Sequence, residues 1–208
     1  MTHVLSHDAD SLNEEQKLHF LKSLNNSAIY LESLLENLLQ WARTTGGTLE
    51  INPRCVSVYD IARQNLKIIS INAENKNIEL INNVAKDAWV TADINLLQTI
   101  FRNLISNAVK YTNEGGKVII SSSKWNERMM AFTIEDNGIG ISKDDIKKLF
   151  RIEMNTKTIG SSTEKGTGFG LILCKDFVEK QGGEIFVESE IDKGSTFRFL
   201  LPFCEKEV

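Results

Sequence analysis

The chain has 208 residues, of which 41% are hydrophobic and 25% are charged, a composition typical of one or two soluble folded domains. Its formal net charge of −4 excludes a general attraction to nucleic acid or anionic lipid, so any phosphate-binding charge must be local. No apolar run approaches the roughly 18 residues that a membrane-spanning helix needs. The first residues also lack the layout of a signal peptide.

Three cysteines, Cys55, Cys174 and Cys204, lie far apart in the sequence and have no metal-ligand spacing. An odd number of widely spaced cysteines is not typical of a disulfide framework. We therefore expect reduced thiols in a cytosolic compartment, each in the core or on the surface.

The segment from Asn13 to Arg43 contains neither glycine nor proline and is predicted to form one long helix. Apolar residues recur along it every seven positions in two sets, which is typical of helices packed side by side in a bundle. The sets are Leu21, Ala28, Leu35 and Ala42, and Leu24, Leu31 and Leu38. The partner would precede this helix or belong to another chain; a surface helix packed on its own domain is the alternative.

Gly46 and Gly47 are expected to end this helix. They divide the chain into a partial helical region, 1–46, and a second domain, 47–208. The second domain shows strands in consecutive pairs with helices between them, which predicts an α+β fold, a two-layer sandwich of one mixed sheet with helices on one face. Helices are predicted at Val58–Ala73, Asp93–Tyr111 and Phe169–Gln181, and strands at Ile78–Asn82, Trp89–Ala92, Lys117–Lys124, Met129–Glu135, Glu184–Glu188 and Ser195–Leu201.

Asp136 follows a predicted strand in which Phe132 and Ile134 are expected to be buried. A carboxylate at such a place is costly to desolvate unless it receives hydrogen bonds, and the exocyclic amine of adenine would be a suitable donor. Gly138 and Gly140 would let a flat ring approach the backbone. The alternative is a tight turn with an Asx cap.

Asn103 and Asn107 are four positions apart on a predicted helix and share one face. Two amide oxygens there could coordinate a hard cation, and magnesium is suitable because it needs few protein ligands. Lys110 and Tyr111 could reach phosphate and ribose one turn later. The alternative is a set of exposed or packed residues with no ligand.

A glycine-rich stretch, 166–170, leads into the helix predicted from Phe169. Free N–H groups at a helix start, together with the helix dipole, form an anion site suited to a triphosphate. The polar stretch Arg151–Lys165 is expected to be a mobile lid over the nucleotide. Lys157 and Lys165 would then approach the phosphates, although a solvated loop without such contacts is equally consistent with the sequence.

From about Leu49 to Phe203 the chain resembles the catalytic ATP-binding domain of bacterial sensor histidine kinases of two-component systems. Its four motifs occur in order, followed by a last glycine motif. They are the N box at Asn103–Thr112, the G1 box at Asp136–Ile141, the first half of the F box at Leu149–Phe150, the G2 box at Gly166–Leu171, and Gly194–Phe197. The resemblance implies the fold of histidine-kinase, gyrase and chaperone-type ATPases, with ATP and Mg²⁺ as cofactors.

The resemblance further implies an adenine contact at Asp136 and a magnesium ligand at Asn107. The ATP-binding set that it implies consists of Asn103, Asn107, Lys110, Tyr111, Asp136, Gly138, Gly140, Ile141, Lys157, Lys165, Gly166, Thr167, Gly168, Phe169, Gly170, Leu171 and Thr196.

The long N-terminal helix resembles the second helix of the family's dimerisation and phosphoacceptor hairpin. This implies a homodimer, a response-regulator receiver domain as partner, and a cytoplasmic core whose parent protein is anchored in the inner membrane. His7 does not fit the phosphoacceptor motif, because Asp10 and Leu12 replace its basic residue and proline. We expect this chain to lack its phosphoacceptor and to be unable to phosphorylate itself.

Hydrolytic machines such as gyrase-type topoisomerases and ninety-kilodalton heat-shock chaperones are the main alternative. They place a glutamate base one turn before the metal-binding asparagine, where this chain has Asn103, which cannot accept a proton. The expected function is therefore donation of the γ-phosphoryl group to a histidine, for relay to a response-regulator aspartate. Anti-sigma-type serine kinases lack the long helix, and a regulatory module that binds a nucleotide without catalysis remains open.

Overall fold

The computed structural model describes residues 50–150 and 169–205, together with single positions between Asn13 and Leu39. The described positions from Gln16 to Leu39 are all helical, which agrees with the predicted long helix. Several predictions lie outside the described residues: the region around His7, the domain boundary after residue 46, the lid, Lys157, Lys165, Gly166, Thr167 and Gly168.

Helices and strands alternate in the described part of the chain much as predicted. The elements are β1 (Arg54–Ser57), α3 (Val58–Glu74), β2 (Glu79–Asn83), β3 (Trp89–Ala92), α4 (Ile94–Tyr111), β4 (Lys117–Lys124), β5 (Met129–Asp136), α5 (Lys143–Ile146), α6 (Gly170–Lys180), β6 (Glu184–Glu190) and β7 (Gly194–Pro202). No helix among these residues is both long and apolar enough to cross a membrane.

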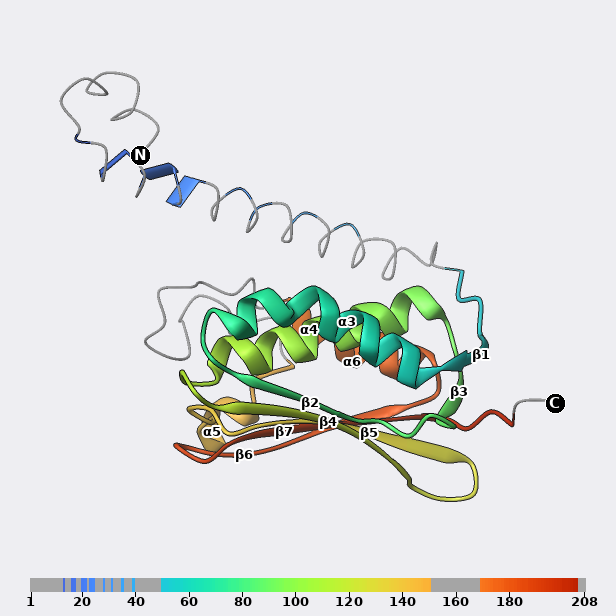
Figure 1. Ribbon diagram of the computed structural model, residues 1–208. Coiled ribbons are helices and arrows are strands. Elements are labelled where there is room, and N and C mark those ends of the chain that lie inside the picture. Colours follow the sequence, from blue (N-terminus) through green and yellow to red (C-terminus); the bar gives the residue numbers. More distant parts are fainter. Residues whose placement is uncertain are drawn as a thin grey trace.

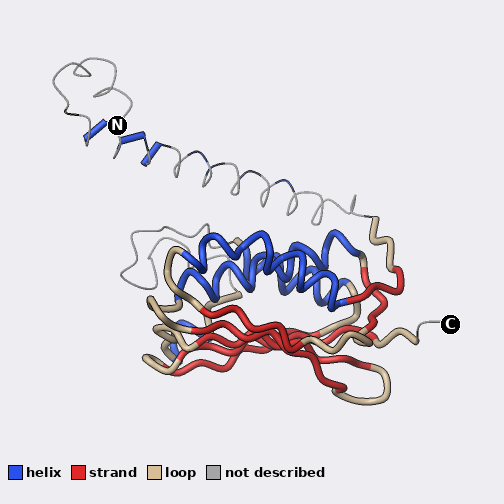
Figure 2. Tube along the Cα trace, in the orientation of Figure 1, coloured by secondary structure: helices blue, strands red, loops and turns tan. Residues whose placement is uncertain are grey.

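Five strands form one mixed sheet in the order β2-β4-β5-β7-β6. β2 pairs with β4 in parallel, and the other pairs are antiparallel. Figures 1 and 2 show that α3, α4 and α6 cover one face of this sheet. The predicted two-layer α+β sandwich is therefore confirmed.

β1 and β3 form a separate two-stranded antiparallel sheet. The strand at Trp89–Ala92 was predicted, but its partner at Arg54–Ser57 was not, since only Cys55 and Val56 of that strand are apolar. Asn52, just before β1, donates its backbone N–H to the carboxylate of Asp93 at 3.0 Å. The same carboxylate caps α4 through the N–H groups of Asn95 and Leu96, as expected of an N-cap.

Three fully buried phenylalanines form the centre of the core. Phe101 of α4 lies edge-on to Phe132 of β5 and to Phe199 of β7, with ring centroids 6.2 and 5.4 Å apart. Such aromatic pairs contribute about 0.5–1.5 kcal/mol beyond the burial of their area. They hold α4 against the middle of the sheet, so that its C-terminal turn reaches the end of β5.

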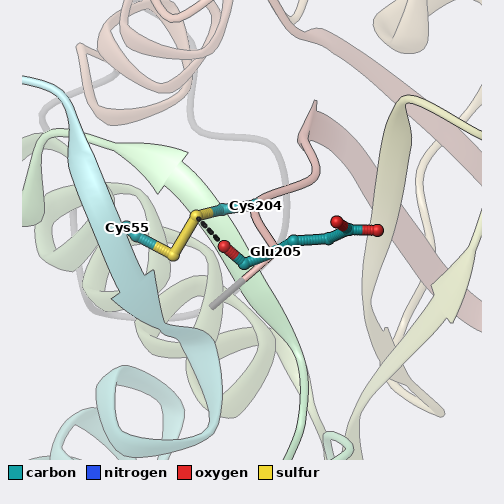
Figure 3. The surroundings of a disulfide bond; sticks show 3 residues. All are labelled: Cys55, Cys204 and Glu205. Atoms are coloured by element: carbon teal, nitrogen blue, oxygen red, sulfur yellow. Dashed lines mark hydrogen bonds between the residues drawn. A yellow bond between two sulfur atoms is a disulfide. The ribbon is translucent and has the colours of Figure 1, made fainter. Parts of the chain in front are cut away.

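Cys55 and Cys204 form a disulfide bond across a sequence separation of 149 residues, shown in Figure 3. The prediction that all three cysteines are reduced is therefore wrong for this pair. β1 pairs with β3, and the N–H of Cys204 donates to the carbonyl of Trp89 in β3 at 3.2 Å. This arrangement brings the two thiols together, whereas Cys174 is free and buried.

Candidate functional site

Asp136 ends β5 with only 6% of its surface exposed. Its Oδ1 accepts the N–H of Gly138 at 2.9 Å and the N–H of Ser195 at 3.3 Å. Burial raises the pKa of Asp136, the two N–H groups oppose that rise, and the charge of Glu135 adds to it. Among the described residues no donor bonds Oδ2, which leaves that oxygen available to a ligand.

The register of β7 decides which of its residues faces this carboxylate. Ser195 lies opposite Asp136, whereas Thr196 lies opposite Glu135 and Glu188. Paired residues point to the same face of a sheet, so Thr196 points to the face that the helices leave uncovered. Ser195 therefore lies beside Asp136, whereas Thr196, which belongs to the predicted ATP-binding set, lies one position away. The alternation of buried residues in β7 could have identified Ser195 instead.

The glycines of the G1 box make room for protein backbone. A Cβ atom on Gly138 would clash with the carbonyl of Tyr111, and one on Gly140 would clash with the carbonyl of Glu190. Gly140 also has a φ of +68°, which favours glycine. The described structure gives these glycines a packing reason, because the loop that carries them lies close to the end of α4 and to β6. Their expected approach to a flat ring stays a prediction.

The loop after β5 is fixed from both sides. The N–H of Ile139 donates to the carbonyl of Tyr111 at 3.1 Å, and its carbonyl accepts the N–H of Asp192 at 2.8 Å. The N–H of Ile141 donates to Oγ of Ser189 at 2.8 Å. Sequence analysis did not identify Ser189, because its role depends on the approach of β6 to this loop.

Asn103 and Asn107 lie on α4 as predicted, and both are half-buried. The amide nitrogen of Asn103 is buried without a hydrogen-bond partner, and its Oδ1 would be 3.1 Å from a Cβ atom on Gly170. Asn103 therefore packs against the first turn of α6. Burial raises the pKa of the nearby Cys174 thiol to about 12.

The amide oxygen of Asn107 is a suitable ligand for a magnesium ion. The described residues contain no group of three or more His, Cys, Asp and Glu side chains that could hold a metal. Magnesium does not require such a cage, because it keeps waters and takes phosphate oxygens beside one or two protein ligands. An ion at this position would therefore combine the Asn107 amide oxygen with groups of a bound nucleotide.

The remaining predicted residues lie at the ends of α4 and α6. Nζ of Lys110 lies 5.2 Å from the ring centroid of Tyr111. Phe169 makes no side-chain cap to α6, so the first N–H groups of that helix are not satisfied by its side chain. Leu171 is partly buried and packs against the core. The start of α6 thus lies beside Asn103 and retains the features of an anion site.

A polar pocket of about 330 Å³ lies at the ends of β5, β6 and β7. Asp136, Ser195 and Lys193 line this pocket, and so do Glu135, Glu188 and Glu190, three carboxylates that would repel a triphosphate. Thr196 also lines this pocket. We therefore take the candidate nucleotide site to extend from Asp136 to the helix side of the sheet, next to α4 and α6, and not toward these glutamates.

Comparison with known proteins matches the part of the chain that contains these residues. Residues 92–205 match the family described as histidine kinase-, DNA gyrase B- and HSP90-like ATPase. The adaptive-response sensory kinase SasA of Synechococcus elongatus is 32% identical over 173 residues, which are 83% of this chain and 44% of SasA. The sensor histidine kinase WalK of Bacillus subtilis is 29% identical over 94% of this chain and 32% of WalK. The chain thus spans less than half the length of these relatives.

The fold is also found in solved structures. Full-length ShkA in complex with AMPPNP has a TM-score of 0.75 and 27% identity, covering 95% of this chain and 41% of ShkA. Histidine kinase ThkA in complex with the response regulator protein TrrA has a TM-score of 0.74 and covers 98% of this chain and 56% of that one. At 19% identity, this second likeness concerns the fold alone.

Proposed function

Because the chain belongs to the family of histidine kinase-, DNA gyrase B- and HSP90-like ATPases, we propose that it is the ATP-binding core of a sensor histidine kinase. In this role it binds ATP with Mg²⁺ and donates the γ-phosphoryl group to a histidine, from which a response-regulator aspartate receives it. The likeness to SasA and WalK supports the kinase class. The AMPPNP complex of ShkA supports an adenine nucleotide as ligand.

The observation that carries this proposal is the half-satisfied carboxylate of Asp136. Two backbone N–H groups hold Oδ1, while Oδ2 has no donor among the described residues. Oδ2 is not buried without a partner, so it is open to solvent and can accept a donor from a ligand. The exocyclic amine of adenine would supply one, and the raised pKa of Asp136 makes this interaction dependent on pH.

The phosphates would lie between α4 and the start of α6. Asn107 would offer its amide oxygen to the metal ion, and the first turn of α6 would offer backbone N–H groups to the phosphates. Bound Mg²⁺ would supply charge neutralisation for phosphoryl transfer. The proposal also includes phosphate contacts from Lys157 and Lys165.

Asn103 favours a phosphoryl donor over a hydrolase. Its position corresponds to the glutamate base of the hydrolytic relatives, and an amide cannot take a proton from water. Its buried amide nitrogen and its contact with Gly170 give it a packing role between α4 and α6.

We extend the proposal to the whole protein through the N-terminal helix. Four described leucines of this helix, Leu21, Leu31, Leu35 and Leu39, are 51–60% exposed, and an apolar row of this kind is typical of a bundle interface. The proposal therefore includes a homodimer, a response-regulator receiver domain as partner, and a cytoplasmic location in a membrane-anchored parent. In a reducing cytosol, Cys55 and Cys204 would be free thiols.

Calorimetry with Mg-ATP and labelling with [γ-³²P]ATP test the proposal together. We expect Mg-ATP binding, little phosphate release and no acid-labile label on the chain, because His7 does not fit the phosphoacceptor motif. Absence of nucleotide binding would refute the proposed function. Rapid phosphate release would favour a hydrolase, and a label lost in His7→Ala would show that the chain carries its own phosphoacceptor.

A further inference from the structure

Lys76 lies in the turn between α3 and β2, outside the stretch that matches the family. Its half-buried side chain reaches the C-terminal end of α4. There Nζ donates to the carbonyls of Val109 at 2.9 Å, Lys110 at 2.9 Å and Thr112 at 2.7 Å. An ammonium group has three hydrogens, so this residue uses its full donor capacity on one helix end.

The C-terminal end of α4 is a favourable place for the Lys76 ammonium group. The last carbonyls of a helix have no partner within the helix, and they carry the negative end of its dipole. α4 has Thr112 rather than glycine after its last residue, and Thr112 bonds back to the carbonyl of Ala108 through both N–H and Oγ1. Lys76 satisfies the carbonyls that this arrangement leaves over.

The G1 loop, which is the loop of the G1 box at Asp136–Ile141, contacts the same helix end that Lys76 holds. The carbonyl of Tyr111 lies in sequence between those of Lys110 and Thr112, and it accepts the N–H of Ile139 at 3.1 Å. Gly138 packs so closely on the same carbonyl that a Cβ atom would not fit. The ammonium group and the G1 loop therefore divide the four terminal carbonyls of residues 109–112 between them.

We propose that Lys76 is a positioning residue for the nucleotide site. By fixing the carbonyls on both sides of Tyr111, it sets the place of the G1 loop, and hence of Asp136, relative to Asn107 one turn earlier on α4. The adenine and the metal-bound phosphates would be held by these two groups, so their spacing decides whether one nucleotide can use both. This inference rests on the proposed function and adds a residue to its site.

Three variants test the proposal. Lys76→Met removes the ammonium group at nearly constant length, Lys76→Arg keeps the positive charge, and Lys67→Met removes an exposed lysine of α3 as the matched control. Affinities for Mg-ATP and for adenosine would be measured well below the lowest melting temperature. Hydrogen exchange of the Ile139 amide would report on the docking of the loop.

We expect Lys76→Met to bind Mg-ATP about tenfold more weakly, since small displacements of positioned groups are costly, and to exchange the Ile139 amide faster. The gain in affinity from adenosine to Mg-ATP should shrink, because the two halves of the site lose their common spacing. Lys76→Arg should recover part of this gain, and Lys67→Met should match the unaltered protein.

A purely structural role would lower the melting temperature of Lys76→Met but leave the nucleotide affinity of the folded protein and the Ile139 exchange unchanged, which would overturn the inference. If Lys76→Met does not fold, Lys76→Arg decides: an affinity and an exchange rate equal to those of the unaltered protein would count against positioning, because a guanidinium cannot reproduce all three contacts. Failure of the unaltered protein to bind Mg-ATP would instead remove the proposed function itself.

Discussion

The backbone N–H of Ser195 donates to Oδ1 of Asp136 at 3.3 Å, across 59 residues of sequence. The same oxygen accepts the N–H of Gly138, so Oδ1 is held both by β7 and by the loop that follows β5. This geometry fixes the orientation of Oδ2 but gives it no hydrogen-bond donor from the described residues. Asp136 is therefore both a costly buried acid and a preformed acceptor, and two predictions follow from these two properties.

Asp136→Asn should weaken the binding of Mg-ATP by about 1–3 kcal/mol, the cost of leaving buried polar groups poorly paired. The new amide nitrogen would face the adenine amine, donor to donor, or would displace the backbone donors. Isothermal titration calorimetry measures this change, with Asp87→Asn in the exposed turn before β3 as the control. Equal affinities for the two variants would exclude the adenine role of Asp136.

The same substitution should stabilise the ligand-free protein at neutral pH. A carboxyl group whose folded-state pKa is raised contributes stability that is complete below its ordinary pKa of about 3.9 and is lost as the pH rises through the raised value. The amide that replaces the carboxyl group carries no charge and does not incur this loss. The difference in melting temperature between Asp136→Asn and the unaltered protein should therefore grow from pH 4 to pH 7, and a constant difference would contradict the role of desolvation.

Gly138→Ala should disturb the packing of the G1 loop on α4. The added Cβ atom would meet the carbonyl of Tyr111, which belongs to the backbone and cannot rotate away. We expect a loss of stability of about 1–3 kcal/mol, as for other overpacked sites, together with weaker nucleotide binding. Gly115→Asn is the control, because Gly115 has open space around it and asparagine tolerates its φ of +75°. Equal melting temperatures for both variants would show that the loop can shift freely.

Reduction of the bond between Cys55 and Cys204 should lower the free energy of unfolding. A crosslink between residues 149 positions apart restricts the unfolded chain strongly, and such bonds typically contribute about 2–4 kcal/mol. Urea denaturation of the Cys55→Ser/Cys204→Ser double variant, compared with the oxidised protein, measures the contribution of the disulfide to the free energy of unfolding.

Cys174 supplies an internal control for that experiment. Its thiol is fully buried, and burial raises its pKa to about 12, so alkylation should modify two thiols in the reduced native protein and the third only after unfolding. If the double variant is as stable as the oxidised protein, the crosslink adds nothing to the fold.

Local patterns in the sequence predicted most of the fold. The apolar positions of Phe132 and Ile134 identified β5, and the helix predicted from Asp93 located the start of α4, because the propensities and capping interactions that form these elements act within a few residues. The same is true of the spacing of Asn103 and Asn107. The nucleotide-binding motifs were also visible in the sequence, although the contacts that they make to a ligand remain predictions.

Other features depend on groups that meet only after the chain has folded. The register of β7 against β5 places Ser195, and not Thr196, beside Asp136. The Cys55–Cys204 bond requires β1, β3 and the end of β7 to lie together, and the role of Lys76 requires the turn after α3 to meet the end of α4. None of these pairings has a local signature.

The sequence by itself therefore determined which elements form and which motifs carry the chemistry, because periodicity, capping and motif spacing are short-range properties. Only the tertiary structure decided which distant groups are in contact. It gave Asp136 a second backbone donor, placed an ammonium group at the end of α4, and brought Cys55 to its disulfide partner. These contacts arise from strand register and helix packing, which bring together residues tens of positions apart and are encoded in no single segment of the chain.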